Sequence, residues 1–363
     1  MNLIQLGWPQ ATAAIAAFAP LSAAGFRLGR IAQEHRGRYQ VYTPEGEWPA
    51  VLTGQLRHST ERLEDFPTVG DWVALRSPDP DGPALIHHCL PRFSQFVRKV
   101  AGQQTAGQVV AANVNTLLLM VGLDGDFNLR RIERYLVMAW DSGATPVLVL
   151  NKADCSADPA QAVAAVAAIA PGVAIHAISA ATGVGLDALA PYLQPGQTIA
   201  LVGSSGVGKS TLTNQLLRRP QQATQAVRSG DSRGRHTTTH RELMPLPDGA
   251  LLIDTPGMRE MQLWVAPDAT SDGLEDTFPD VEALAAQCKF RDCQHQAEPG
   301  CAVQAALAAG DLSPQRWASY DKLQREQQWL VRRQDGQAAA NTKRRWKQIT
   351  QTLRQKHRDR GGT

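Results

Sequence analysis

Residues 203–211 have the composition and spacing of a loop that binds phosphate groups. They fit the pattern Gly-x-x-x-x-Gly-Lys-Ser/Thr. Gly203 and Gly208 allow backbone turns that a Cβ atom would hinder, so successive N–H groups can point at phosphate oxygens. Lys209 would bring its charge to the outer phosphates, and the Ser210 hydroxyl could ligate Mg²⁺. The predicted nucleotide contacts in this loop are Gly203, Ser204, Ser205, Gly206, Val207, Gly208, Lys209, Ser210 and Thr211.

The sequence on either side supports this interpretation over an ordinary glycine-rich turn. Residues 198–202 form a short apolar run typical of a strand, and 211–217 have the apolar spacing of a helix. A loop between a strand and a helix places the helix N-terminus opposite the anion, which favours phosphate binding.

A second motif, Asn-Lys-Ala-Asp, follows the apolar run 144–150. The carboxylate of Asp154 can accept hydrogen bonds from guanine N1–H and the exocyclic amine, a donor pair that adenine lacks. The stem of Lys152 can lie along the purine ring beside Ala153, and Asn151 can tie this loop to its neighbours. Such tetrapeptides also occur as simple strand-exit turns, so the prediction of guanine binding depends on the phosphate loop as well.

Further pieces complete a predicted GTP-binding set. Ser179 and Ala180 end the strand-like run 173–178, and their main-chain groups could contact guanine O6. The polar segment 228–239 reads as a mobile loop. It contains three consecutive threonines that are candidate Mg²⁺ ligands, namely Thr237, Thr238 and Thr239.

The run 251–254 is a predicted strand that ends in Asp254, which could hold the water shell of the metal. Gly257 follows closely and could present its N–H to the γ-phosphate. Each piece alone could be an ordinary turn, and only their combination predicts a GTP site.

Three cysteines and a histidine lie within fourteen residues: Cys288, Cys293, His295 and Cys301. Three thiols and one imidazole are the ligand set of a closed structural zinc site. The spacing favours metal binding in a reducing compartment over a disulfide framework, with unliganded cysteines as the alternative.

The elements that position these motifs follow from the apolar pattern. Strand-like runs at 115–122, 144–150 and 198–202 alternate with helical segments at 129–140 and 163–169. Such alternation predicts an α/β domain with a parallel sheet covered on both faces. Ligand loops then gather at the carboxyl ends of the strands.

The region before this domain, about 26–90, contains several short β-like runs punctuated by Gly, Pro and Asp. We expect a small OB-type barrel there. Its cations and aromatic ring suit phosphate contact and base stacking, although a solvated barrel face fits them equally well. The residues in question are Arg27, Arg30, His35, Arg36, Arg38 and Tyr39.

Composition sets further limits. The chain has 363 residues, which suggests two or three domains, and a formal net charge of +3. From Lys322 onward twelve basic and three acidic residues give +9, which leaves −6 for the rest. This basic end is either a tail for a polyanion or a solvated helix face.

No apolar run is long enough to span a bilayer, so no membrane partner is expected. The Ala-rich stretch 11–24 lacks the preceding basic residue of a signal peptide and is interpreted as a short amphipathic helix. We expect a monomeric, cytoplasmic protein.

The order of the motifs is unusual. In most GTPases the phosphate loop comes first, whereas here the guanine motif at 151–154 and Ser179 precede Gly203. The chain therefore resembles a circularly permuted GTPase. Together with the cysteine cluster, this order closely resembles the ribosome small-subunit-dependent GTPase A family, also called YjeQ, over nearly the whole length.

The resemblance implies three domains, with GTP or GDP, Mg²⁺ and one structural Zn²⁺ as ligands. It places an N-terminal helix and OB-fold RNA-binding domain at 1–100 and the permuted P-loop GTPase domain at 101–265. A helical zinc-binding domain with a basic tail occupies 266–363. It also implies late maturation of the small ribosomal subunit, with rRNA and protein contacts that stimulate GTP hydrolysis. The family's loop histidine corresponds to His236 and its switch threonine to Thr238.

Hydrolysis by the isolated chain should be slow. Ras-like GTPases place a glutamine after Asp-x-x-Gly to orient the attacking water, but Met258 stands here. His236 is the candidate catalytic replacement, and an exposed loop histidine without that role is the alternative. We hypothesise that the subunit orders residues 228–239 around it. A large-subunit assembly GTPase, or an RNA-binding assembly module with a weakly active nucleotide site, are the competing functions.

Overall fold

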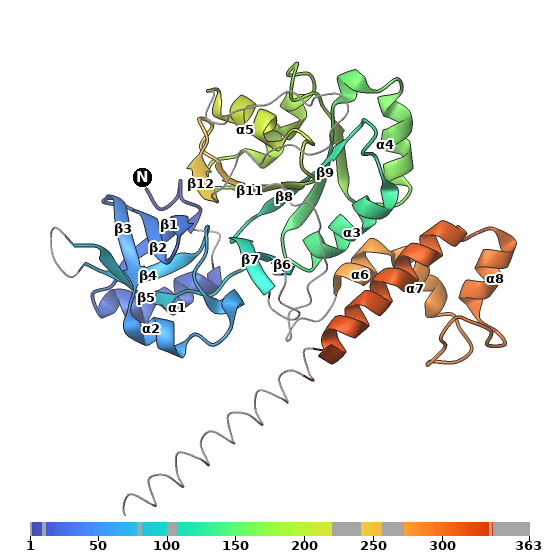
Figure 1. Cartoon of the computed structure of the whole chain (residues 1–363), viewed down its shortest axis with the longest axis horizontal. Coiled ribbons are helices and arrows are strands. Elements are labelled where there is room, and N and C mark those ends of the chain that lie inside the picture. Colours follow the sequence, from blue (N-terminus) through green and yellow to red (C-terminus); the bar gives the residue numbers. More distant parts are fainter. Residues whose placement is uncertain are drawn as a thin grey trace, which may run out of the picture.

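The computed structural model describes residues 2–8, 12–77, 82–99, 107–219, 241–255, 272–333 and 336. Within them, a β-barrel, an α/β domain and a group of C-terminal helices follow one another along the chain (Figure 1). The expected fold class is confirmed, whereas the exact domain boundaries stay a prediction. None of the helices in these described ranges is long and apolar enough to cross a membrane.

The N-terminal barrel is closed by five strands. They are β1 (Arg27–His35), β2 (Arg38–Thr43), β3 (Gly46–Leu52), β4 (Trp72–Arg76) and β5 (Ala84–Cys89). Strand β1 pairs with β2 on one side and β4 on the other, and the order β1-β2-β3-β5-β4 completes the ring. Alternating residues such as Ile31, Val41 and Ile86 fill its interior. Two short helices, α2 (Gly54–Ser59) and η2 (Leu63–Asp65), connect β3 to β4.

The cationic and aromatic residues predicted to contact RNA do not all lie on the surface. Arg30 and Tyr39 are buried, so they are interior residues and the interpretation of these two as surface contacts is wrong. Tyr39 points into the barrel because alternate side chains of a pleated strand face inward, whereas Arg30 is covered by the N-terminal segment and the α/β domain. Arg27, His35, Arg36 and Arg38 remain exposed.

Helix α1 (Thr12–Ala23) forms where a helix was expected, but it is not amphipathic. Its sequence contains no charged residue, and Ala14 is its buried residue. Phe18 packs edge-on against Trp8, which in turn contacts Trp72 of the barrel. Ala17 and Leu21 also pack into the small apolar cluster around Leu28, whereas Ile15 stays 38% exposed.

The α/β domain contains the predicted parallel sheet. Its strands are β8 (Thr116–Gly122), β9 (Thr145–Asn151), β10 (Ala174–Ala177), β11 (Thr198–Gly203) and β13 (Leu251–Asp254). They run in parallel in the order β10-β9-β8-β11-β13, and β12 (Glu242–Pro245) adds an antiparallel strand.

Both faces of this sheet are covered, as the apolar runs predict. Leu117 and Leu119 of β8 pack with helices α3 (Leu129–Trp140) and α4 (Pro159–Ala167) on one face. The intervening residues of β8 point to the other face, where α5 (Lys209–Leu217) and η4 (Leu186–Tyr192) lie. Strands buried on both faces need continuous apolar sequence, which is why these runs do not alternate.

The barrel and the parallel sheet are joined by β12 and by a small two-stranded sheet. Strand β12 pairs with β1 through Gln33 and Glu242, so the two domains share a hydrogen-bonded edge. Strands β6 (Gln95–Lys99) and β7 (Gly107–Ala112) pair with each other beside this junction. Sequence analysis did not predict these three strands.

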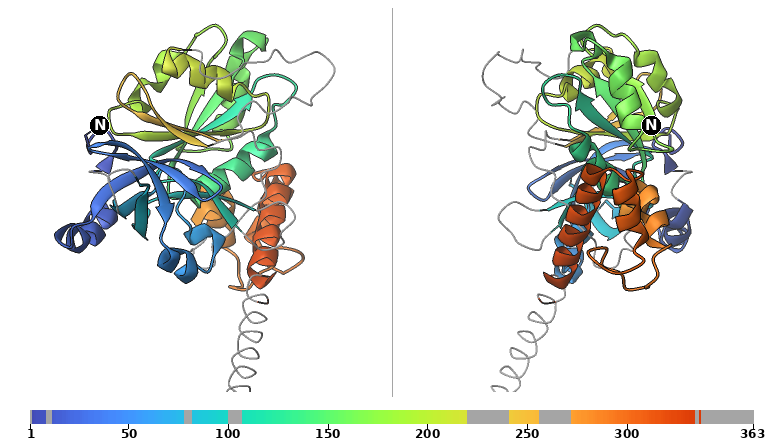
Figure 2. Two further views of the ribbon diagram at one scale, coloured as in Figure 1. Left: turned by 60° about the vertical axis from the view of Figure 1, so that its left-hand side comes forward. Right: turned by 90° about the vertical axis from the view of Figure 1, so that its right-hand side faces the viewer.

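The C-terminal part is helical, with α6 (Asp272–Thr277), α7 (Pro279–Ala285), α8 (Ala302–Ala309) and a last helix over residues 314–333. Ser313 caps that last helix through its hydroxyl, as predicted. Figure 2 shows these helices below the parallel sheet, beside α3. The fully buried carboxylate of Glu133 on α3 accepts hydrogen bonds from Arg316 and Ser319, which fastens the helices to the sheet domain.

One buried guanidinium, that of Arg30, connects the barrel to the α/β domain. Arg30 is 1% exposed and donates to the carbonyls of Leu6, Gly70 and Asn113 and to the hydroxyl of Thr198. These acceptors belong to the N-terminal segment, the barrel, the junction and the start of β11. Burial lowers the pKa of Arg30 to about 9, although nearby Asp71 opposes the change. The side chain therefore remains charged at neutral pH.

Replacing Arg30 should destabilise the whole assembly. Arg30→Ala is expected to lower the free energy of unfolding by about 3–5 kcal/mol, because several buried acceptors lose their donor together. Arg27→Ala, on the same strand, is the matched control. Its exposed ion pair with Glu45 should contribute at most about 1 kcal/mol. Urea unfolding followed by circular dichroism measures both, and equal midpoints for the two variants would contradict the assigned role.

Candidate nucleotide-binding and metal sites

The predicted nucleotide residues that lie in the described ranges gather at one edge of the parallel sheet. The carboxyl ends of β8, β9, β11 and β13 meet there, and polar turns follow β8, β9 and β11. This edge is where open parallel sheets bind ligands. The permuted order of the motifs along the chain leaves their spatial grouping intact.

The phosphate loop connects β11 to α5, as the sequence predicts. A Cβ on Gly203 would lie 2.5 Å from the carbonyl oxygen of Met120, and one on Gly208 would lie 2.2 Å from Nδ2 of Asn151. Gly208 also has a φ of 102°, which L side chains rarely adopt. Close packing therefore requires glycine at both positions, in addition to any need of a bound phosphate.

Lys209 lies at the start of α5, 7% exposed. Its Nζ donates to the carbonyl oxygens of Gly203 and Ser204, both at 2.7 Å. Burial lowers the pKa of Lys209 to about 8, and the charge of Asp254 works in the opposite direction. The ammonium is thus charged near neutral pH and lies within the phosphate loop itself.

Asn151 joins three of the predicted loops. Its Nδ2 donates to the carbonyl of Val207 in the phosphate loop at 2.7 Å, and its Oδ1 accepts from the N–H of Ala180 at 2.9 Å. The side chain is 3% exposed, so both bonds are shielded from water. One amide therefore fixes the guanine motif, the phosphate loop and the Ser179–Ala180 turn relative to one another.

The other residues of the guanine motif are more open. Asp154 is exposed, and a hydrogen bond from the Ser179 hydroxyl holds its pKa below the usual value, so it is ionised at neutral pH. Lys152 has a left-handed backbone and binds Asp124 at 2.6 Å through Nζ. Ala153 donates its N–H to the carbonyl of Ile178, which holds this turn against the neighbouring loop.

The remaining predicted residues of this edge are placed by the same elements. Gly206 is exposed at the tip of the phosphate loop with a φ of 80°, whereas Val207 is buried beneath it. Partly buried positions are held by Ser204, Ser205, Ser210 and Thr211. Asp254 is buried at the end of β13, paired in register with Leu201 of β11. Five predicted residues lie outside the described ranges: His236, Thr237, Thr238, Thr239 and Gly257.

Sequence analysis missed two carboxylates at this edge. Asp124 and Asp126 follow β8, and Asp126 accepts a 2.6 Å hydrogen bond from the hydroxyl of Ser204. It also forms an ion pair with Arg131 at 2.6 Å. The available signal was their position directly after a buried strand, at the same edge as the phosphate loop.

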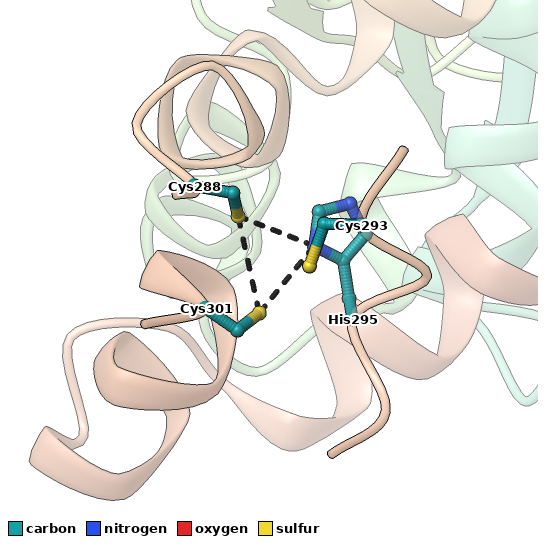
Figure 3. A group of neighbouring side chains, drawn as sticks. All are labelled: Cys288, Cys293, His295 and Cys301. Atoms are coloured by element: carbon teal, nitrogen blue, oxygen red, sulfur yellow. Dashed lines mark hydrogen bonds between the residues drawn. The ribbon is translucent and has the colours of Figure 1, made fainter. Parts of the chain in front are cut away.

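The four predicted metal ligands converge in the C-terminal helical part (Figure 3). The Nδ1 of His295 lies 3.5 Å from the sulfurs of both Cys288 and Cys301, and those sulfurs are 3.9 Å apart. Tetrahedral zinc, with bonds of about 2.3 Å to sulfur and about 2.0 Å to nitrogen, requires separations of about 3.8 and about 3.5 Å. The donor set thus fits zinc in chemistry and in size, with Cys293 as the fourth ligand.

The loop that carries these ligands is braced by its own polar groups. The carboxylate of Glu298 accepts hydrogen bonds from its own backbone N–H and from those of Gln294, Gln296 and Ala297, which lower the pKa of Glu298 to about 2. Gln304 donates to the carbonyl of His295, and the ring of Trp317 packs edge-on against its imidazole. Such contacts orient ligands before a metal arrives.

A protein-family model described as RsgA GTPase matches residues 89–264. Over 369 residues the chain is 49% identical to the small ribosomal subunit biogenesis GTPase RsgA of Opitutus terrae, covering 99% of each sequence. It is 47% identical over 299 residues to the protein of the same name from Xanthomonas axonopodis, covering 82% of this chain and 80% of that one.

Two solved structures are similar in fold. The crystal structure of YjeQ from Thermotoga maritima superposes with a TM-score of 0.59 at 27% identity, covering 82% of this chain and 97% of that one. The circularly permuted GTPase YloQ has a TM-score of 0.57 at 24% identity, covering 83% and 94%. The second likeness supports the fold alone.

Proposed function

This chain belongs to the RsgA GTPase family, and from that premise we propose that it hydrolyses GTP to GDP and phosphate during biogenesis of the small ribosomal subunit. The observation that carries the nucleotide site is the Asn151 amide, which holds the guanine motif, the phosphate loop and the Ser179–Ala180 turn at one edge. The names of the curated relatives support the ribosomal role.

In the proposed site each group has a separate task. Asp154 reads the guanine edge, and its ionised state suits hydrogen bonds from N1–H and the amine. The N–H groups of the phosphate loop and the charge of Lys209 bind the phosphates. Ser210, Asp254 and Thr238 would hold Mg²⁺, which neutralises charge on the phosphates when bound. Gly257 would contact the γ-phosphate and His236 would orient the attacking water.

The proposed partner is the small ribosomal subunit, contacted through rRNA and protein. Exposed cations on the barrel, including Arg27, Arg36 and Arg38, suit phosphate contacts. We assign residues 1–100 to RNA binding, 101–265 to GTP hydrolysis and 266–363 to a zinc-bearing domain, in a monomer that works in the cytoplasm.

We further propose one structural zinc per chain, held by Cys288, Cys293, His295 and Cys301. The support is the near-tetrahedral spacing of the donor atoms. All four ligand positions are filled by protein atoms, which is typical of structural rather than catalytic zinc. Zinc would stabilise the loop between α7 and α8 by linking ligands from both its ends.

Cys293→Ser should abolish zinc binding, because three remaining ligands hold the ion much less tightly and metal binding supplies folding energy to such loops. Atomic absorption of purified protein should find about one zinc in the wild type and almost none in the variant. Cys155→Ser, which removes an exposed thiol outside the cluster, is the control and should keep its zinc. Equal metal content in all three proteins would refute the assignment.

Asp154→Asn should weaken GTP binding by about tenfold or more, since hydrogen bonds to a charged acceptor are lost. ATP binding should stay poor. The affinity for xanthosine triphosphate should rise, because the C2 carbonyl of xanthine can accept a hydrogen bond from the new amide. Asp187→Asn, at an exposed position in η4, is the control. Calorimetric titration of each nucleotide tests this, and equal affinity of the wild type for ATP and GTP would overturn guanine recognition.

Added small subunits should raise single-turnover GTP hydrolysis by orders of magnitude over a slow basal rate of about 10⁻⁴–10⁻³ s⁻¹. His236→Ala should bind GTP normally and lose most of that stimulation. Large subunits serve as the control particle and should have little effect. Fast hydrolysis without any particle would contradict the stimulation, whereas a fully stimulated His236→Ala variant would remove the histidine from the mechanism.

A further inference from the structure

The turn between β8 and α3, residues 123–128, contacts both of the loops that would bind the nucleotide. Its Asp124 accepts a hydrogen bond from Nζ of Lys152 at 2.6 Å, in the guanine motif. Its Asp126 accepts one from Oγ of Ser204 at 2.6 Å, in the phosphate loop. Two carboxylates, two residues apart, therefore each hold one of these loops. Neither carboxylate belongs to any of the motifs that define the site.

The turn itself is rigidly built. The N–H of Asp126 donates to Oδ1 of Asp124, and the N–H of Phe127 donates to the Asp124 carbonyl. The N–H of Leu123 donates to the carbonyl of Asn151, which ties the turn to the guanine motif a second time. At the other end Asn128 caps α3. Movement of one carboxylate is consequently transmitted to the other through a few short bonds.

Each carboxylate is neutralised by a cation, which matters beside a loop that binds anions. Lys152 pairs with Asp124, and Arg131 of the first turn of α3 pairs with Asp126. Burial raises the pKa of Asp124, but the hydrogen bond and charge of Lys152, together with hydrogen bonds from backbone N–H groups of the turn, outweigh it, and the pKa lies below its usual value. The hydrogen bond that Arg131 donates to Asp126 raises the pKa of Arg131. Asp124 and Arg131 are thus ionised at neutral pH.

We propose that the 123–128 turn is a clamp on the bound nucleotide, in which Asp124 positions Lys152 against the base and Asp126 positions Ser204 of the phosphate loop. The inference rests on the proposed nucleotide site and adds two positioning residues to it. Because hydrogen bonds to charged groups are among the stronger ones in proteins, opening either side of the clamp shortens the residence time of GDP.

The clamp is tested by release of a fluorescent GDP analogue from the full chain, chased with unlabelled GDP. Asp126→Ala and Ser204→Ala should each speed release by about tenfold, and the double variant no further, because both single changes remove the same bond. Asp124→Ala and Lys152→Met form the second pair with the same expected pattern, because Met removes the ammonium that binds Asp124 and keeps an apolar side chain along the base. Asp311→Ala removes an exposed carboxylate from the zinc-bearing part and should release GDP at the wild-type rate.

A charge rescue separates positioning from a general loss of structure. Arg131→Ala leaves Asp126 uncompensated next to the phosphate loop and should weaken GDP binding, more so at low salt. Adding Asp126→Asn removes that charge and should restore most of the affinity. A merely structural role for Arg131 would give no rescue, and that result would overturn the electrostatic part of the proposal.

The clamp would be overturned if the single variants of both pairs released GDP within twofold of the wild-type rate. It would also be overturned if the rate increase of each double variant were the product of the two single increases. If the wild-type chain bound no guanine nucleotide, the proposed function and the clamp would both be wrong. Normal binding with unchanged release in the variants would reject the clamp alone.

Discussion

The nucleotide site depends on the buried amide of Asn151. The motifs lie far apart in the chain, and their loops connect to different strands, so sheet pairing alone fixes only where each loop begins. Asn151 then bonds to the phosphate loop with one end and to Ala180 with the other. An amide is suited to this task because it donates and accepts at once. An aspartate at this position would place a carboxylate oxygen against the Val207 carbonyl. Neither oxygen could donate, so both buried acceptors would lack a hydrogen bond.

Two buried arginines hold the flanking domains to the sheet in a related way. Arg30 joins the barrel to the start of β11, and Arg316 joins the C-terminal helices to Glu133 of α3. In both cases the planar guanidinium reaches several acceptors from different segments, which a lysine ammonium could not do with the same geometry. The sheet domain is therefore fastened on both sides by buried polar contacts, with apolar packing around them.

Local sequence was sufficient to predict the elements whose pattern is self-contained. Strand 251–254 and helix 129–140 were placed to the residue, because continuous apolar runs and helical spacing are local properties. The short strands β6, β7 and β12 were missed, since their stability comes from partners distant in the chain. The same reason explains why Arg30 was interpreted as a surface cation, whereas the lack of charged residues in α1 is a local property of its sequence. At the site, motif residues were predictable from spacing, whereas Asp124 and Asp126 matter only through contacts with Ser204 and Lys152.

The reach of Arg30 has a consequence for synthesis of the chain. Its acceptor on Thr198 lies 168 residues further along the sequence. At a translation rate of about 5–20 residues per second, that hydroxyl is made roughly ten to thirty seconds after Arg30. During this interval the guanidinium must stay hydrated or bind the carbonyls of its own early segments. The hydrogen-bond set of Arg30 is thus completed only when the strand that leads into the phosphate loop arrives.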